Sequence, residues 1–155
     1  MVGIVKTYTT IGIDGQLLTV ECDSAGQMYS VNIVGMASNA VKESKDRIFA
    51  ALSNSGFEAA IKRFTINLAP ADIRKDSAAL DLPIAISVLQ SIKQLPVEYL
   101  SQTAIIGELS LDGNLRPVKG VLPIALAAKR DGMDALVLPY ENAEEAAIIE
   151  ELKVI

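Results

Sequence analysis

The first third of the chain alternates between apolar and polar residues. Residues 3–12 and 28–34 are rich in Ile, Val and Tyr, and residues 17–22 alternate strictly. Alternation of this kind is typical of strands with one buried face. An Asp-Gly pair at 14–15 and a Ser-Ala-Gly-Gln stretch at 24–27 are turn signals between these runs. The short connections predict a three-stranded antiparallel meander.

The apolar spacing changes to the helical period after residue 38. Between 38 and 54, apolar residues recur every three or four positions, which predicts a helix with one buried face. A polar loop at 69–79 precedes a second helix that runs to about residue 93. Its Pro83 must lie in the first turn, where a missing N–H costs little. Since residues 82–92 carry no charge, we expect this helix to be the central buried one.

The rest of the chain predicts a mixture of strands and helices. The expected strands lie at 64–68, 104–111, 115–118 and 135–138, and the expected helices at 120–130 and 142–151. In the last helix, Asn142 and Glu145 have the spacing of a capping box. Hairpins mixed with crossovers favour an α+β fold of two layers, with helices packed on one face of a mixed sheet. The length and the lack of a linker predict a single domain, residues 1–155.

The composition excludes several kinds of catalytic and metal site. The chain has no histidine and a single cysteine, Cys22, so a Ser-His-Asp triad and a Cys/His zinc site are impossible. Cys22 lies in an alternating strand pattern, which indicates a half-buried core thiol. It can form no disulfide within the chain, which fits a reducing compartment. With no signal peptide and no apolar run of membrane length, we expect a cytoplasmic protein without membrane contact.

The net charge of −5 argues against nucleic-acid binding as the main role of this chain. Duplex binding requires clustered Lys and Arg that neutralise phosphates. The basic residues here are scattered, as at 62–63, 74–75 and 129–130, and acidic residues lie near each pair. A nucleic-acid-binding module is the weaker alternative, because a local basic face can overrule net charge.

Four longer strings resemble the N-terminal domain of magnesium-chelatase-like AAA+ proteins. They are NIVGMASNAVKESKDR at 32–47, NLAPADIRKD at 67–76, LDLPIA at 80–85 and GELSLDGNLRPVKGVLP at 107–123. With LPYEN at 138–142 they cover nearly all of the chain in the expected order. The family includes a competence-associated DNA branch-migration helicase and relatives of the magnesium chelatase ATPase subunit. The resemblance implies a ribosomal protein S5 domain 2-like fold, related to the proteolytic domain of Lon.

The resemblance also implies a longer parent protein with an AAA+ ATPase module that assembles as a homo-hexamer. That module would bind ATP and magnesium, and its motor would make the main DNA contacts. A Walker A loop needs Gly-x-x-x-x-Gly-Lys-Ser/Thr, because its backbone N–H groups wrap the phosphates. No Gly-Lys pair occurs in this chain. We therefore expect no cofactor in this fragment and a non-catalytic role that aids assembly or substrate engagement of the motor.

The resemblance to Lon raises a second hypothesis, a serine-lysine peptidase. Lon-type peptidases use a serine nucleophile that a neutral lysine activates. In this chain Ser77 opens the corresponding helix, whereas the position of the Lon lysine falls on Leu122, which cannot accept a proton. Lys119, one turn away, is the remaining candidate base. The competing interpretation makes Ser77 a helix N-cap that accepts a backbone N–H.

Three acidic residues surround the loop before the buried helix. Asp72, Asp76 and Asp81 could bind Mg²⁺ or act as acid and base. Alternatively, they cap the helix, where negative charge is favoured, or form salt bridges with the neighbouring basic residues at 74–75. A separate expectation concerns the Gly-Met pair at 35–36, which we interpret as a possible docking edge at the start of the first helix.

Overall fold

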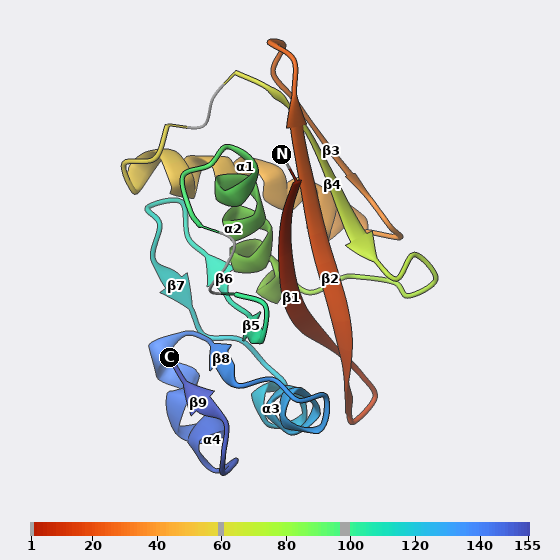
Figure 1. The fold of residues 1–155 in the computed structure, drawn as a ribbon, viewed down its shortest axis with the longest axis vertical. Helices are drawn as coiled ribbons and strands as arrows, with labels where there is room; N and C mark the ends of the chain where they lie inside the picture. The colour runs from red at the N-terminus through yellow and green to blue at the C-terminus, as the bar shows by residue number, and fades with distance from the viewer. Residues whose placement is uncertain (1, 59–60, 97–99) are drawn as a thin grey trace.

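The computed structural model describes residues 2–58, 61–96 and 100–155, and Figure 1 shows its fold. The N-terminal half holds β1 (Val2–Ile11), β2 (Asp14–Ala25), β3 (Ser30–Val34), α1 (Asn39–Asn54), β4 (Arg63–Ala69) and α2 (Asp81–Ser91). The C-terminal half holds β5 (Thr103–Ile105), β6 (Glu108–Leu109), β7 (Leu115–Arg116), α3 (Val121–Arg130), β8 (Ala135–Val137), α4 (Ala143–Ala147) and β9 (Lys153–Val154). Short 3₁₀ helices, Ala78–Leu80 and Tyr140–Asn142, precede α2 and α4.

Seven strands form one mixed sheet in the order β3-β4-β2-β1-β5-β8-β9, and β6 pairs with β7 in a separate hairpin. The β1–β2 hairpin is antiparallel along its whole length, and β2 pairs antiparallel with β4. The remaining neighbours in the large sheet are parallel. The expected α+β class with a mixed sheet is therefore confirmed.

The expected three-stranded meander is wrong at its third strand. β3 does not pair with β2, because β4 lies between them and pairs with both. The chain passes from β3 through α1 to β4, and a helical crossover of this kind joins parallel neighbours. The long-range pairing of β2 with β4 thus displaces the local pairing that a short connection suggests.

Two further sequence predictions are corrected in the C-terminal half. The expected strand 104–111 is divided into β5 and β6, because Gly107 turns its backbone toward α2: its N–H donates to the Ala79 carbonyl at 2.9 Å and its carbonyl accepts from Leu82 at 3.0 Å. The expected helix 142–151 ends at Ala147, and the chain then returns as β9 beside β8. The Asn142 side chain caps no backbone N–H of α4. Its Nδ2 donates to the Glu145 side chain at 3.1 Å, so the expected pair is in contact, and the Asn142 amide also bonds the backbone of Val118.

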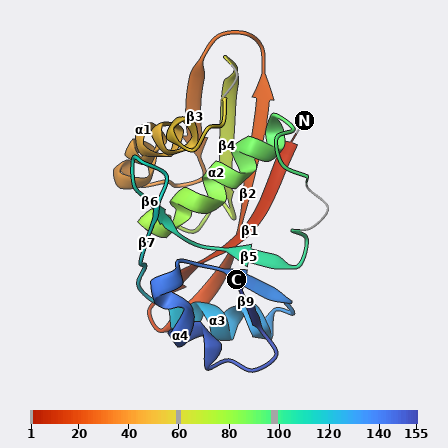
Figure 2. The same ribbon diagram turned by 90° about the vertical axis from the view of Figure 1, so that its left-hand side faces the viewer.

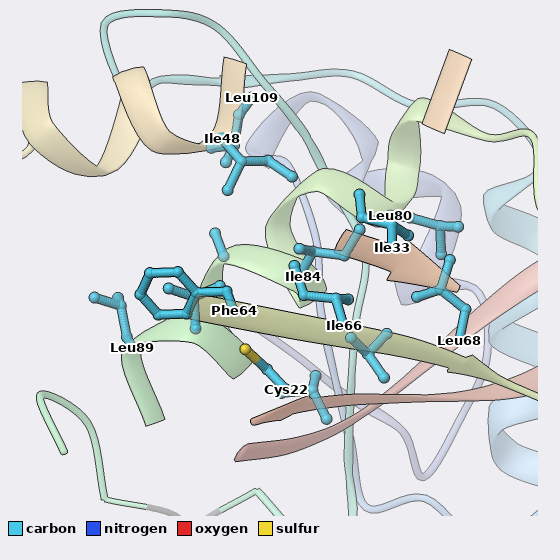
Figure 3. Packing of buried hydrophobic residues seen from close by; sticks show 14 of the residues in the cluster. Cys22, Ile33, Ile48, Phe64, Ile66, Leu68, Leu80, Ile84, Leu89 and Leu109 are labelled. Atoms are coloured by element: carbon cyan, nitrogen blue, oxygen red, sulfur yellow. The ribbon is translucent and has the colours of Figure 1, made fainter. Parts of the chain in front are cut away.

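The core consists of two clusters on opposite faces of the sheet. α1 and α2 cover one face, where Cys22, Phe64 and Ile84 meet; Figure 3 shows this cluster. The second cluster lies on the other face and includes the buried residues of α3. In β5, Ile105 belongs to the first cluster and its neighbour Ala104 to the second, because successive side chains of a strand point to opposite faces. The expected arrangement of helices on one face therefore describes α1 and α2, while Figures 1 and 2 show α3 and α4 gathered at one end of the sheet.

Cys22 is more deeply buried than its pattern predicts. Its side chain has no exposed area, and its Sγ lies 3.6 Å from the Ser91 hydroxyl of α2. Pro83 lies in the first turn of α2 as expected. The α2 helix is the central one, since most of its residues are buried beneath β1 and β2.

Candidate functional site

The structure brings Ser77 and Lys119 to one pocket of about 310 Å³. The pocket lies where the end of β1, the segment before α2 and the start of α3 meet. Its lining residues are Thr10, Ser77, Ala78, Ala79, Glu108, Pro117, Val118, Lys119 and Gly120. The two peptidase candidates from the sequence therefore share a cavity, although more than forty positions separate them along the chain.

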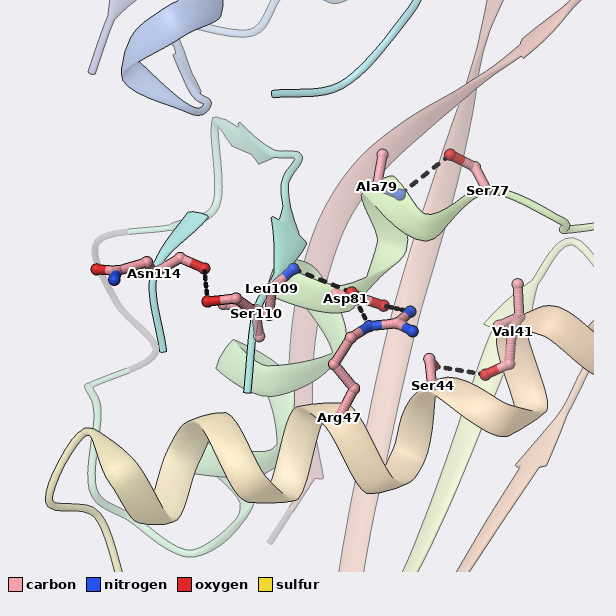
Figure 4. Close-up of polar contacts among 9 residues, drawn as sticks. All are labelled: Val41, Ser44, Arg47, Ser77, Ala79, Asp81, Leu109, Ser110 and Asn114. Carbon is pink, nitrogen blue, oxygen red and sulfur yellow. Dashed lines mark hydrogen bonds and ion pairs between the residues drawn. The ribbon is translucent and has the colours of Figure 1, made fainter. Parts of the chain in front are cut away.

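The Ser77 side chain acts as a helix cap. Its hydroxyl oxygen accepts the backbone N–H of Ala79 at 3.1 Å, at the start of the 3₁₀ helix Ala78–Leu80. Figure 4 shows this bond. The capping interpretation is confirmed, since the first N–H groups of a helix have no partner within the helix and a serine oxygen supplies one.

Lys119 is exposed at the rim of the pocket. It precedes Gly120, whose φ of 76° lies in the left-handed region and starts α3. Among the described residues, no hydrogen bond joins the Lys119 amine to Ser77. Leu122, which the resemblance to Lon is expected to set at the lysine position, is 40% exposed and is not among the residues that line the pocket.

Two further polar side chains of the pocket, Thr10 and Glu108, were not identified from the sequence. Thr10 comes from the end of β1, and only the fold brings it beside Ser77. Glu108 follows Gly107 at the start of the second hairpin and adds a carboxylate to the same cavity. A strand-end threonine and a surface glutamate carry no sequence signal that would distinguish them from solvated residues.

Asp81 is buried and forms a bidentate ion pair with Arg47 of α1. Arg47 donates to the two carboxylate oxygens, through Nε at 2.8 Å and Nη2 at 2.9 Å, and the Leu109 N–H donates at 3.0 Å. Figure 4 shows the three bonds converging on Asp81. Hydrogen bonding to this carboxylate raises the pKa of Arg47. The partner of Asp81 comes from another helix and not from the neighbouring basic residues at 74–75.

The three aspartates of the loop do not converge. Asp72 and Asp76 are exposed, whereas Asp81 points inward to Arg47. In the described part of the chain, no group of three or more acidic, histidine or cysteine side chains has an arrangement that could hold a metal ion. Asp81 does lie in the first turn of α2, where its negative charge is favoured by the helix dipole.

Lys75 is a buried residue that sequence reasoning placed in an exposed polar loop. Its side chain has no exposed area, and its amine donates to the Gly35 carbonyl at 2.6 Å and to the Pro70 carbonyl. Desolvation by burial lowers its pKa. Its backbone also bonds Met36 and Ser38. Lys75 thereby ties the loop that carries Ser77 to the start of α1.

Comparison with known proteins identifies the family. A family profile described as "Subunit ChlI of Mg-chelatase" matches residues 20–142, which include Ser77, Lys119 and Leu122. The chain belongs to the ChlI family. The ChlI match covers α1 to α3 and every residue that lines the pocket except Thr10.

Several curated relatives extend the ChlI match to nearly the whole chain. An uncharacterized protein of Mycobacterium tuberculosis is 41% identical over 143 residues, and competence protein ComM of Haemophilus influenzae is 38% identical over 146 residues. Lon protease 2 of Bacillus subtilis is 28% identical over 160 residues. The alignments cover 92%, 94% and 92% of this chain, but the chain spans only 28% of the length of each relative.

No helix among the described residues has the length and apolar character that crossing a membrane requires.

Proposed function

We propose that this chain is the non-catalytic N-terminal accessory domain of a magnesium-chelatase-like AAA+ ATPase. In this proposal it aids the assembly or substrate engagement of a hexameric motor that remodels DNA, for which branch migration is the leading task. Membership of the ChlI family and similarity to competence protein ComM support the assignment. The relatives' greater length leaves room for a motor module, since this chain spans 28% of ComM.

The observation that carries the proposal is the chemistry of the pocket. A serine nucleophile requires a base within about 3 Å of its hydroxyl. The Ser77 oxygen accepts a backbone N–H, and Lys119 is exposed. The resemblance to Lon implies that Leu122 stands at the position of its lysine. Each of these features favours a structural role for the segment over peptide cleavage.

We further propose a ribosomal protein S5 domain 2-like fold related to the Lon proteolytic domain. The mixed sheet with its β-α-β crossover and the similarity to Lon protease 2 along 92% of the chain support this classification. The parent's ATPase module would bind ATP and magnesium, form the homo-hexamer and make the main DNA contacts. The proposed location is the cytoplasm.

A serine-lysine peptidase is the second candidate, because Ser77 and Lys119 line one pocket. In that reaction the neutral Lys119 amine would take the Ser77 proton as the hydroxyl attacks a peptide carbonyl. Lys119, which is exposed, would have to turn inward to reach the Ser77 hydroxyl.

The two candidates are separated by activity measurements on the chain and on its parent. We expect the purified chain to hydrolyse neither ATP nor peptides and to resist a fluorophosphonate probe of reactive serines. We expect deletion of this domain from the parent to impair hexamer assembly or DNA remodelling while the ATPase module still hydrolyses ATP. Labelling that disappears in both Ser77→Ala and Lys119→Met would instead establish the peptidase.

A further inference from the structure

The two edges of the seven-stranded sheet differ in how they are protected. β9 forms one edge; it has two residues, and one of them is the exposed Lys153. β3 forms the other edge with five residues, Ser30–Val34, and none of them is charged. Natural sheets usually protect an edge with a charge, a proline, a bulge or a very short strand. The β9 edge uses two of these devices, and β3 uses none.

The open side of β3 presents backbone groups in a defined pattern. The Ser30 N–H donates to the Lys62 carbonyl on the β4 side. Since the groups of successive residues point to opposite sides of a strand, those of Val31 and Ile33 point away from β4. Within the described residues, β3 pairs with β4 alone. Figure 1 shows β3 at the border of the sheet, on the side away from β1 and β2.

The charge pattern indicates what kind of strand fits this edge. Residues 24–41, which contain β3, form the longest stretch of the sequence without Asp, Glu, Lys or Arg. The stretch is not hidden in the core, because Met28, Tyr29, Val34 and Met36 are each at least 40% exposed. Two copies of a chain with net charge −5 repel each other, but at this edge they can meet without placing like charges together.

From this pattern we propose that β3 pairs antiparallel with β3 of a second copy of this chain, across a two-fold axis at Asn32. Full overlap of Ser30–Val34 sets Val31 of one copy opposite Ile33 of the other. The backbone N–H and C=O groups of Val31 and Ile33 are the ones that point away from β4. In this register each of these groups therefore gains a hydrogen-bond partner on the other copy. β-branched residues then face each other, which favours the pairing. The self-association is independent of the proposed function.

The register makes a specific geometric prediction at Asn32. In an antiparallel pair, residues opposite each other without mutual hydrogen bonds have Cα atoms about 4.5 Å apart. A disulfide accepts Cα separations of about 4.4 to 6.8 Å. Asn32 is exposed on the outer face, and the only native cysteine, Cys22, is fully buried. An Asn32→Cys variant should therefore form a disulfide between two copies.

Thr65→Cys is the matched control, because Thr65 is the β4 partner of Asn32 and is exposed on the same face one strand further in. With diamide as the oxidant, we expect Asn32→Cys to cross-link about tenfold faster than Thr65→Cys. Equal rates for the two variants would overturn the proposal. So would cross-linking of Ser30→Cys with itself at the rate of Asn32→Cys, because the proposed register sets Ser30 opposite Val34.

Sedimentation of the chain over a wide range of concentration gives a second measurement. We expect a reversible dimer that Asn32→Lys abolishes, since two lysines would face each other at the axis. Thr65→Lys, with the same added charge, should still dimerise. A chain that is monomeric at every concentration, or a dimer that persists in Asn32→Lys, would contradict the pairing.

Discussion

Arg47 and Asp81 form an ion pair that joins the middle of α1 to the first turn of α2. The carboxylate is 1% exposed, and it also accepts the Leu109 N–H of β6. The Asp81 side chain thus connects α1, α2 and the β6–β7 hairpin. Asp81 is the first residue of α2, directly after the 3₁₀ helix that lines the pocket.

Removal of the Asp81 carboxylate should destabilise the fold. Asp81→Ala leaves the Leu109 N–H and the Arg47 guanidinium without their partner, and we expect a loss of about 2–3 kcal/mol in the free energy of unfolding. Asp81→Asn keeps an acceptor for Leu109 and should lose less. Urea denaturation measures both variants. Equal losses would indicate that the bond to Leu109 contributes nothing.

Lys75 should make the stability depend on pH in the alkaline range. Desolvation lowers the pKa of Lys75 below its ordinary value of 10.5. Between these two pKa values the folded chain binds fewer protons at this site than the unfolded chain, so the group favours folding more as pH rises. Below the lowered pKa, that contribution is lost. The neutral amine still has N–H groups for the carbonyls of Gly35 and Pro70.

Comparison with Lys75→Met isolates this contribution. The difference in the free energy of unfolding between wild type and variant should shift in favour of wild type as pH rises toward about 10.5. Denaturation at a series of pH values measures the difference. A difference that stays constant with pH would show that the folded chain leaves Lys75 as well solvated as the unfolded chain.

The Cys22 thiol should be unreactive in the folded protein. Burial raises its pKa to about 11, and β2 and α2 enclose the sulfur. Since the thiolate is the reactive form, we expect the native chain to react with Ellman's reagent at least about a hundredfold more slowly than the urea-unfolded chain. Thr65→Cys adds an exposed thiol and should react at once, which checks the reagent. Rapid labelling of the native wild type would contradict the enclosed position.

Gly15 should tolerate no side chain, because β2 crosses α3 there. A Cβ at Gly15 would lie 2.6 Å from the Ala127 Cβ and 2.8 Å from the Pro123 carbonyl oxygen. We expect Gly15→Ala to lower the free energy of unfolding by about 1–3 kcal/mol through forced separation of strand and helix. Gly132→Ala is a useful comparison, since its φ of +82° adds strain while nothing lies within 4 Å. Thermal unfolding of both variants distinguishes steric overlap from backbone strain.

Local elements were largely predictable from the sequence. The β1–β2 hairpin follows from alternation, although the expected turn pair Asp14-Gly15 lies in β2 and the chain turns at Gly12 and Ile13. The helix α1 follows from its apolar spacing. Ser77 could be identified as a cap because serine before a helix offers an oxygen to free N–H groups. These features depend on residues close together in the chain, so a single sequence carries the signal.

The candidate site was only partly predictable. Ser77 and Lys119 were found through a resemblance, but their shared pocket with Thr10 and Glu108 required the fold. The burial of Lys75 was not predicted, because its partners are two backbone carbonyls and the side-chain pattern of the sequence does not reveal them. The Asp81 partner was missed because Arg47 lies on another helix.

By itself, the sequence determined the hairpin, the main helices, the lack of histidine chemistry and the lack of a Walker A loop. Tertiary structure alone decided the insertion of β4 between β2 and β3, the burial of Lys75 and the uncharged edge of the sheet. Strand order depends on which distant segments bury the most apolar surface and satisfy the most backbone groups together. The outcome depends on contacts between segments far apart in the chain, and short-range sequence patterns carry no information about these contacts.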